Sequence, residues 1–307
     1  MAGETALIGI DWGTTTFRAF RIDGRGTALE TRTAPAGILK VANADFEGAL
    51  AEQIGDWLEA LPAAPVIASG MITSRQGWVE VPYCDCPAGG QELAAALLAH
   101  ATASGRVIHF VPGVALIDRD GVPDVIRGEE TQIIGAVGEK PGRWLFLLPG
   151  THSKWALVED ERIVWFATFM TGELFAVLTE HSILGRLMQG HEQEESAFAR
   201  GLAYAREGPG GLLKRLFSAR TLALFDRLAP RGVAAYLSGL LIGSEIAEAL
   251  ACLNEVPPDE VTLIGAPELA ERYVVALEAF GLRGRRGADD ASARGHHRIA
   301  QAAGLIG

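Results

Sequence analysis

A short apolar strand, a turn of glycine and threonine, and a second strand occur twice in this chain of 307 residues. The first turn is Asp11–Thr16, and the second is Pro149–Ser153, about 137 residues later. In each copy, the segment after the turn lacks a helical period, so the pattern predicts a β-hairpin and not a strand that leads into a helix. Repetition of one supersecondary unit at this distance predicts two related halves.

The remaining pattern predicts an α/β fold in each half. Apolar residues at steps of three and four predict a helix over 46–61, and the run at 66–69 predicts a buried strand. We expect further helices and strands at 91–103, 107–111, 128–137, 233–253, 261–264, 268–280 and 292–303. Residues 70–90 and 283–286 are expected to form loops. At roughly 150 residues per domain, the length predicts domains 1–138 and 139–307, with the last helix free to pack on the first.

Composition excludes several classes of protein. The formal net charge of −11 argues against a nucleic-acid surface, which needs clustered lysine and arginine. The three cysteines have no metal-site spacing and fit a reducing compartment. The short acidic start of the chain does not resemble a signal peptide, and no apolar run of ~18 residues predicts a membrane span. We therefore expect a cytoplasmic protein without a nucleic-acid or membrane partner; a homo-oligomer is left open.

The chemistry of the two turns favours phosphate binding. Backbone N–H groups and hydroxyls in a tight Gly-Thr turn can surround an oxyanion, and glycine permits close approach. Asp11 beside the first turn is a candidate ligand for Mg²⁺. Lys154 after the second turn could reach a phosphate, and His152 could donate to one. The alternatives are ordinary capped turns and a lysine on a strand surface.

Longer stretches resemble the 2-dehydro-3-deoxygalactonokinase family, within the sugar kinase, heat-shock 70 and actin superfamily. The resemblance runs from Ile8 to about Tyr273. It is carried by the segments 70–78, 127–132, 148–155, 170–175 and 181–185. It implies two actin-like ATPase (ribonuclease H-like) domains with ATP and Mg²⁺ in a cleft between them. It also implies transfer of the γ-phosphoryl group of ATP to the 6-hydroxyl of 2-dehydro-3-deoxy-D-galactonate, in galactonate catabolism.

The resemblance also implies which residues bind the nucleotide. The first phosphate loop would be Gly13, Thr14 and Thr15, and the second Gly150, Thr151, His152, Ser153 and Lys154. The turn Gly265-Ala266-Pro267, between a strand and a helix, is similar to the superfamily's adenosine motif. The segment 289–298 does not resemble the family, and no function is assigned to it.

Two roles are predicted from the chemistry of phosphoryl transfer. A carboxylate often takes the proton of the acceptor hydroxyl. We predict Glu130, at a helix start, as this catalytic base, with Glu129 as the alternative and Asp11 as the other catalytic residue. Both glutamates could instead only complement the helix dipole.

A sugar acid needs a cation for its carboxylate, and the long loop after residue 69 offers one. We predict substrate contacts from Ser74, Arg75, Gln76 and Trp78, with Arg18 and Arg127 as secondary candidates. Arginine binds a carboxylate through two hydrogen bonds, and long loops in compact domains often carry function. The alternative is that Met71 and Trp78 pack this loop for stability.

Two other functions compete with the kinase. A phosphoanhydride hydrolase of the same fold would release phosphate without a sugar acid, and segment 127–130 loosely resembles exopolyphosphatases. A non-catalytic actin-like scaffold or a sugar-sensing regulator would neither phosphorylate a sugar acid nor release phosphate. The expected lack of a helix-turn-helix before the first strand counts against the regulator. The sequence leaves open selectivity between the galactonate compound and its gluconate epimer.

Overall fold

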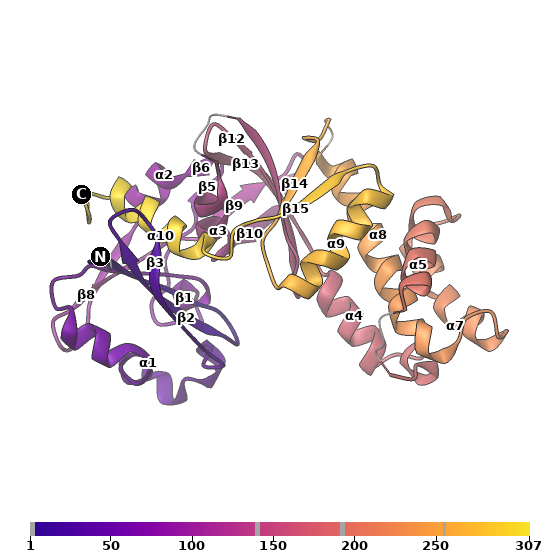
Figure 1. Cartoon of the computed structure of the whole chain (residues 1–307), viewed down its shortest axis with the longest axis horizontal. Coiled ribbons are helices and arrows are strands. Elements are labelled where there is room, and N and C mark those ends of the chain that lie inside the picture. The colour runs from indigo at the N-terminus through magenta and orange to yellow at the C-terminus, as the bar shows by residue number, and fades with distance from the viewer. Residues whose placement is uncertain (1–3, 139–141, 191–193, 254–255) are drawn as a thin grey trace. The chain divides into compact units, whose positions relative to one another are not determined.

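The computed structural model describes residues 4–138, 142–190, 194–253 and 256–307. The chain divides into two compact units (Figure 1). The first unit comprises Met1–Arg143, Leu157–Phe166 and Gly287–Gly307, and the second comprises Trp144–Ala156 and Ala167–Arg286. The expected boundary between residues 138 and 139 borders residues 139–141, which lie outside the described residues.

The first unit is built on a six-stranded sheet of order β3-β2-β1-β4-β8-β7. Its strands are β1 (Thr5–Trp12), β2 (Phe17–Asp23), β3 (Ala28–Ala34), β4 (Val66–Ser69), β7 (Leu98–Ala101) and β8 (Val107–Phe110). The first three strands pair antiparallel, and β4 and β8 continue from β1 in parallel. The carboxyl ends of β1 and β4 therefore lie side by side, with Asp11 opposite Ser69 in the register.

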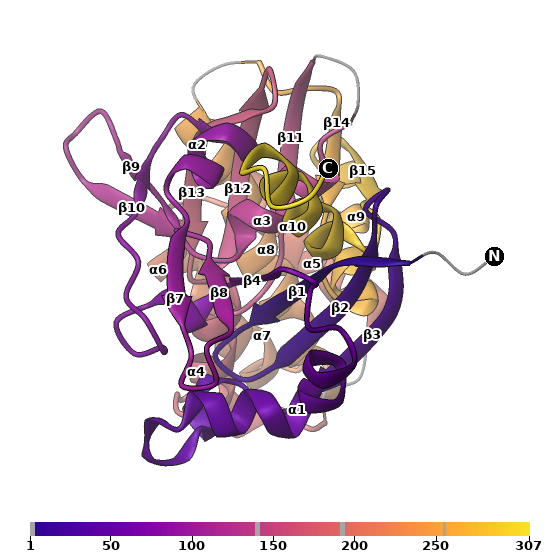
Figure 2. The same cartoon turned by 90° about the vertical axis from the view of Figure 1, so that its left-hand side faces the viewer.

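The two faces of β1 pack against different helices (Figure 2). Ile8, Ile10 and Trp12 belong to the core formed with α1 (Phe46–Ala60), which is capped by the Asp45 side chain on the Gly48 N–H. Because successive side chains of a strand point to opposite faces, Gly9 and Asp11 face the other way. That face is covered by α10 (Ala291–Ala302).

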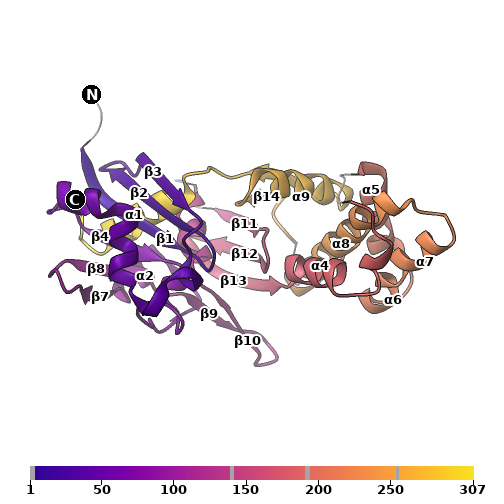
Figure 3. The ribbon, with the colours of Figure 1, turned by 90° about the horizontal axis from the view of Figure 1, so that it is seen from below.

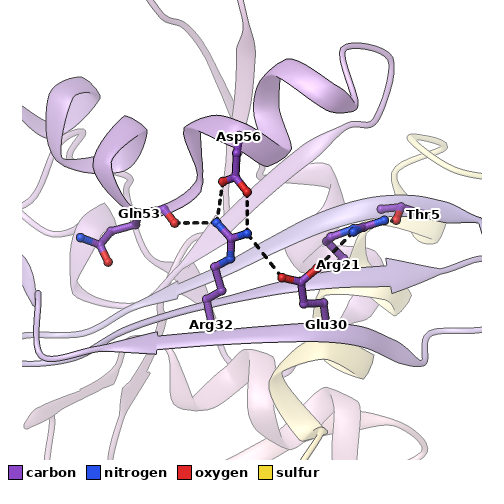
Figure 4. A network of polar contacts seen from close by, with 6 residues as sticks. All are labelled: Thr5, Arg21, Glu30, Arg32, Gln53 and Asp56. Atoms are coloured by element: carbon purple, nitrogen blue, oxygen red, sulfur yellow. Dashed lines mark hydrogen bonds and ion pairs between the residues drawn. The ribbon is translucent and has the colours of Figure 1, made fainter.

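A polar network fastens the edge strand β3 to α1 (Figure 4). Arg32 donates to both carboxylate oxygens of Asp56, at 2.5 and 2.6 Å, and to the backbone oxygen of Gln53 at 3.0 Å. The guanidinium also lies 4.3 Å from the Trp57 ring centroid. A bidentate ion pair that also contacts a ring is held in a more defined geometry than an isolated surface ion pair. An isolated surface pair contributes about 0–1 kcal/mol to the free energy of unfolding.

The stretch between β4 and β8 departs from the prediction. It contains η3 (Met71–Thr73), β5 (Cys84–Asp85), β6 (Ala88–Gly89) and α2 (Gly90–Ala95). The helix predicted over 91–103 is wrong beyond Ala95, because Leu98–Ala101 pairs antiparallel with β8 as β7. Propensity cannot reveal such a pairing, since it depends on a partner strand.

Further elements complete this unit. A three-stranded sheet has the order β10-β9-β5, and α3 lies against α10 (Figure 2). The new elements are β9 (Val114–Ile117), β10 (Pro123–Ile126) and α3 (Glu129–Ala136), with the short turns η1 (Ile38–Lys40) and η2 (Ala42–Ala44) before α1.

A second six-stranded sheet has the order β15-β14-β11-β12-β13-β6. Its new strands are β11 (Arg143–Leu148), β12 (Ser153–Glu159), β13 (Arg162–Phe169), β14 (Glu260–Leu263) and β15 (Arg283–Arg286). From β13 to β15 the order matches that of β3-β2-β1-β4-β8: the third, second, first and fourth strands of each sheet are followed by one later strand. The predicted α/β class is thus confirmed. The loop predicted at 283–286 is wrong, because this basic stretch pairs in parallel with β14.

Strand β6 and the stretch Leu157–Phe166 of this sheet belong to the first unit. Outside the sheet, the second unit is helical (Figure 3). Its helices are α4 (Thr171–Glu180), η4 (Gly185–Leu187), α5 (Glu195–Glu207), α6 (Leu212–Leu216), α7 (Ser218–Leu224), η5 (Pro230–Gly232), α8 (Val233–Leu253) and α9 (Pro267–Ala279). Helix α8 is central, contacted by α4, α5, α6, α7 and α9. Among the described residues, one helix, at Pro230–Leu253, is long and apolar enough to span a membrane by length and composition alone; 72% of its apolar window is buried, as in a core helix.

Candidate active site

Asp11 lies at the carboxyl end of β1 with its side chain enclosed. Its Oδ2 accepts hydrogen bonds from Arg18, its neighbour across the β1–β2 hairpin, from Ser292 at 3.0 Å and from Gln132 at 3.5 Å. No described residue donates to Oδ1, which lies next to Gly70. Gln132 and Ser292 were not predicted for the site; Ser292 is 281 positions away in the sequence.

The first Gly-Thr turn presents donors and not acceptors. The carbonyl oxygens of Gly13, Thr14 and Thr15 accept hydrogen bonds from the backbone N–H groups of 37–39. Gly37 is required at this contact, because a Cβ there would lie 2.3 Å from atoms of Thr14 and Thr15. Among the described residues, no acceptor pairs with the N–H of Thr14 or Thr15, and both residues are exposed. Such N–H groups can bind an anion.

Two glycines let the neighbouring segments approach the end of β1. Gly70 has φ +93°, and a Cβ at this position would lie 2.9 Å from the Trp12 oxygen. Gly128 has φ +108°, and its Cβ would lie 3.0 Å from the Gly70 Cα. Glycine alone adopts this backbone without strain. The segments that follow β4 and precede α3 therefore meet beside Asp11.

Arg127 holds the loop that follows Gly70. Its guanidinium donates to the Thr73 oxygen at 2.5 Å, to the Thr73 hydroxyl at 2.6 Å and to the Val81 oxygen at 3.0 Å. It also covers the ring of Tyr83 at 4.2 Å. With these partners Arg127 fixes the loop.

The loop's predicted substrate residues fall into two groups. The Arg75 side chain is 86% exposed and pairs with Glu80, and Gln76 is also exposed. Ser74 caps the loop by donating to the Met71 oxygen at 2.7 Å. Trp78 is instead stacked on Phe46 and packed into the core, which matches the alternative of a packing role.

The two candidate bases differ in access. The Glu130 carboxylate is fully buried, accepting from the Gly128 N–H at 2.6 Å and from the Thr131 hydroxyl at 3.0 Å. Burial, and then the nearby charge of Glu129, raise the pKa of Glu130 to about 7. Glu129 is partly exposed and accepts from the Arg127 N–H at 2.9 Å. Full burial does not suit a base that must touch an acceptor hydroxyl.

In the second unit, the second Gly-Thr turn rests on the first residues of α4. The Thr151 oxygen accepts the Glu173 N–H at 2.9 Å, and a Cβ on Gly172 would lie 2.4 Å from the Gly150 oxygen. His152 Nε2 lies 2.5 Å from a Glu173 carboxylate oxygen. Lys154 is buried, and its ammonium donates to the His152 oxygen at 2.8 Å.

Ser153 does not face solvent. Its hydroxyl is buried and donates to the Glu245 carboxylate on α8 at 2.7 Å. The same carboxylate accepts from Trp155 Nε1 at 2.9 Å and from the Tyr273 hydroxyl at 2.5 Å. Burial raises the pKa of Glu245, and hydrogen bonds with Thr171, Tyr273, Ser153 and Trp155 oppose that rise. Glu245 was not predicted for the site, although it is one of only two acids, with Glu248, inside the apolar stretch 233–253.

The Gly265-Ala266-Pro267 turn lies beside the second Gly-Thr turn. Strands β11 and β14 are parallel neighbours, so the turns that follow them start at the same edge of the sheet. A Cβ on Gly265 would lie 3.4 Å from the Pro149 oxygen. Ala266 is the N-cap of α9 and Pro267 its first residue.

A metal ion would depend on bound phosphate as well as on protein. In the parts of the chain that the structure describes, no three His, Cys, Asp or Glu side chains are grouped to hold one. Magnesium typically takes one or two carboxylates together with phosphate oxygens and water. Oδ1 of Asp11 fits a ligand of this kind.

Two sheets of one strand order, each with a Gly-Thr hairpin between its first two strands, define the actin-like ATPase class of α/β protein, as predicted. The family model for 2-keto-3-deoxy-galactonokinase matches residues 11–299. The chain therefore belongs to this kinase family, which confirms the predicted family and enzyme class.

Individual relatives agree. The "Probable 2-dehydro-3-deoxygalactonokinase DgoK1" of Rhizobium meliloti is 39% identical over 280 residues, covering 90% of each chain. The 2-dehydro-3-deoxygalactonokinase of Escherichia coli is 35% identical over 274 residues, covering 89% of this chain and 90% of the relative. A crystal structure named as a "putative 2-dehydro-3-deoxygalactonokinase" of Sinorhizobium meliloti superposes with a TM-score of 0.84 at 38% identity, covering 96% of this chain and 98% of that one.

Proposed function

We propose that the protein transfers the γ-phosphoryl group of ATP to the 6-hydroxyl of 2-dehydro-3-deoxy-D-galactonate, as a cytoplasmic step of galactonate catabolism. The observation that carries this proposal is the family match over residues 11–299. It includes both Gly-Thr turns and the Gly265-Ala266-Pro267 turn. The two halves, 1–138 and 139–307, are proposed to be the two actin-like domains, with the last helix, α10, packed on the first.

The nucleotide would be bound by backbone donors. The N–H groups of Thr14 and Thr15 have no acceptor among the described residues, which supports phosphate binding at the first turn. At the second turn, Gly150, Thr151 and His152 are open to a phosphate, and the buried Lys154 ammonium is bound to the His152 oxygen. Gly265, Ala266 and Pro267 would contact the adenosine. Ser153 would act indirectly, because its hydroxyl is used by Glu245.

Asp11 would hold Mg²⁺ through Oδ1. The ion, when bound, offsets the negative charge of the phosphates as the phosphoryl group moves. Arg18, on Oδ2, would orient the carboxylate and is therefore proposed as a positioning residue.

Glu129 is the better candidate for the base in this conformation. It is partly exposed, whereas Glu130 is enclosed by Gly128 and Thr131. Glu130 could accept the proton only if the start of α3 moved. Comparing Glu129→Gln with Glu130→Gln separates the two: the true base should lose kcat by at least about a hundredfold, with little change in KM.

Arg75 and Gln76 are proposed to bind the sugar acid, with Ser74 and Arg127 shaping the loop. The guanidinium of Arg75 is exposed, and so is its ion-pair partner Glu80, so it suits the substrate carboxylate. Trp78 is retained as a packing residue.

The proposal is tested by coupled ADP release with Mg·ATP. The acceptors would be 2-dehydro-3-deoxygalactonate, its gluconate epimer, glycerol and none. Release with the galactonate compound alone supports the proposal. Equal release without an acceptor would identify a hydrolase, and no release under any condition would refute a kinase of this specificity.

A further inference from the structure

Helix α10 brings two polar side chains to the ends of β1 and β4. Ser292 is 3% exposed, and its hydroxyl donates to Asp11 Oδ2 at 3.0 Å. One turn later, His296 is fully buried, with Nε2 2.9 Å from the Ser69 hydroxyl. Because Asp11 and Ser69 are opposite each other in the parallel register, both contacts lie at one edge of the sheet. No function of this helix is predicted from the sequence.

Close helix packing makes these contacts possible. A Cβ on Gly295 of α10 would lie 1.8 Å from the Thr131 oxygen of α3. A Cβ on Gly135 of α3 would lie 1.9 Å from the Ala291 oxygen of α10. On the sheet side, a Cβ on Gly9 would lie 2.6 Å from His296 Nδ1. Glycine on three elements thus lets α10 sit deep enough for Ser292 to reach Asp11.

Among the described residues, the hydrogen-bond donors around Asp11 use only one of its two carboxylate oxygens. Arg18, Gln132 and Ser292 come from β2, α3 and α10, and all three donate to Oδ2. Ser292 also lies 3.5 Å from an Arg18 nitrogen, so its hydroxyl accepts from Arg18 while it donates to Asp11. Three donors on one oxygen fix the rotation of the carboxylate. The other oxygen, Oδ1, is left for a ligand.

We infer that Ser292 is a positioning residue for phosphoryl transfer: its hydroxyl orients the Asp11 carboxylate so that Oδ1 can bind the metal ion of the nucleotide. The inference rests on the proposed function, in which Asp11 holds Mg²⁺. A hydrogen-bond partner behind a metal ligand changes metal affinity by about 10–100-fold when it is removed. Helix α10 is thereby part of the reaction site and not only a cover for the sheet.

The test compares Ser292→Ala and Ser292→Cys with Gln301→Ala, an exposed residue of the same helix. Two quantities are measured: the Mg²⁺ concentration for half-maximal kcat, and the Mg²⁺ dependence of ADP binding by titration calorimetry. Thermal unfolding shows whether each variant is folded. We expect Ser292→Ala to raise the Mg²⁺ requirement about tenfold in both assays, Ser292→Cys to raise it less, and Gln301→Ala to leave it unchanged.

Each result has one meaning. If folded Ser292→Ala has the wild-type Mg²⁺ dependence of ADP binding, the inference is wrong. If Ser292→Ala does not fold, Ser292→Cys decides by the same criterion. If the wild type binds Mg·ADP but releases no ADP with the sugar acid, the proposed function fails. The binding assay would still decide the role of Ser292.

Discussion

The hydroxyl of Ser153 lies 2.7 Å from the carboxylate of Glu245, which joins the second Gly-Thr turn to the central helix α8. Trp155 and Tyr273 donate to the same buried carboxylate. The position of this turn therefore depends on Glu245, which is 92 positions away from Ser153 in the sequence.

Replacing Glu245 should damage both stability and nucleotide binding. Glu245→Ala leaves three buried donors without an acceptor, and we expect a loss of about 3–5 kcal/mol in the free energy of unfolding. Glu245→Gln keeps an acceptor for Ser153 and should cost less, but raise KM for ATP several-fold. Urea unfolding and initial rates measure these effects. Wild-type stability for Glu245→Ala would contradict the assigned network.

Glu130 should make stability depend on pH. Its pKa is raised to about 7, so between pH 4.5 and 7 the folded protein holds a proton that the unfolded chain releases. The free energy of unfolding contributed by this group therefore falls as pH rises through that window, by at most about 3 kcal/mol. Glu130→Gln should lack this fall. The difference in the free energy of unfolding, variant minus wild type, should therefore be more positive at pH 8 than at pH 5.

The same unfolding series should include Glu52→Gln, which removes an exposed glutamate of the same unit. An equal gain in Glu52→Gln, or no relative gain in Glu130→Gln, would show that the buried carboxyl is not the origin of the pH dependence.

Two glycine-to-alanine changes should have opposite signs. At Gly295 the new Cβ would lie 1.8 Å from the Thr131 oxygen, so α10 must move away from α3, and we expect a loss of at least about 2 kcal/mol. At Gly55 of α1 the nearest atom is the Ala51 Cβ at 3.8 Å, an ordinary contact. Alanine there should stabilise by up to about 1 kcal/mol. Thermal unfolding distinguishes the two; equal effects would refute the close α3–α10 contact.

Substitutions of Arg75 and Arg127 should distinguish a residue that binds the sugar acid from one that holds the loop in place. Arg75→Ala should raise KM for the sugar acid about tenfold or more without changing thermal stability, because this side chain is 86% exposed. Arg127→Lys should also raise that KM, but it should lower the melting temperature, because Thr73 and Val81 lose a fixed donor. A lower melting temperature for Arg75→Ala, together with an unchanged one for Arg127→Lys, would contradict the proposed roles.

Local features of the fold could be predicted from sequence, and tertiary ones could not. The turns at 11–16 and 149–153 carry their own glycine and threonine signals, and the strands on both sides were predicted. Strand β15 was missed because Arg283–Arg286 has no apolar residue and becomes a strand only beside β14. The hydrogen bond from Ser292 to Asp11 joins residues 281 positions apart, and no local pattern specifies such a pairing.

The candidate bases show the same limit. Sequence placed both glutamates at the start of a helix, where α3 does begin with Glu129. Which of the two is enclosed depends on how Gly128 and Thr131 surround Glu130. That is decided by packing and not by spacing.

The position of phosphorylation can be read directly from the product. After incubation of the protein with Mg·ATP and 2-dehydro-3-deoxygalactonate, a proton-coupled ³¹P spectrum of the product should show a phosphate ester coupled to the two protons of C6. Asp11→Asn should form this product at least about a hundredfold more slowly. An ester coupled to a single proton would place the phosphate on a secondary hydroxyl, and inorganic phosphate alone would mean hydrolysis; either result would contradict the proposed 6-kinase activity.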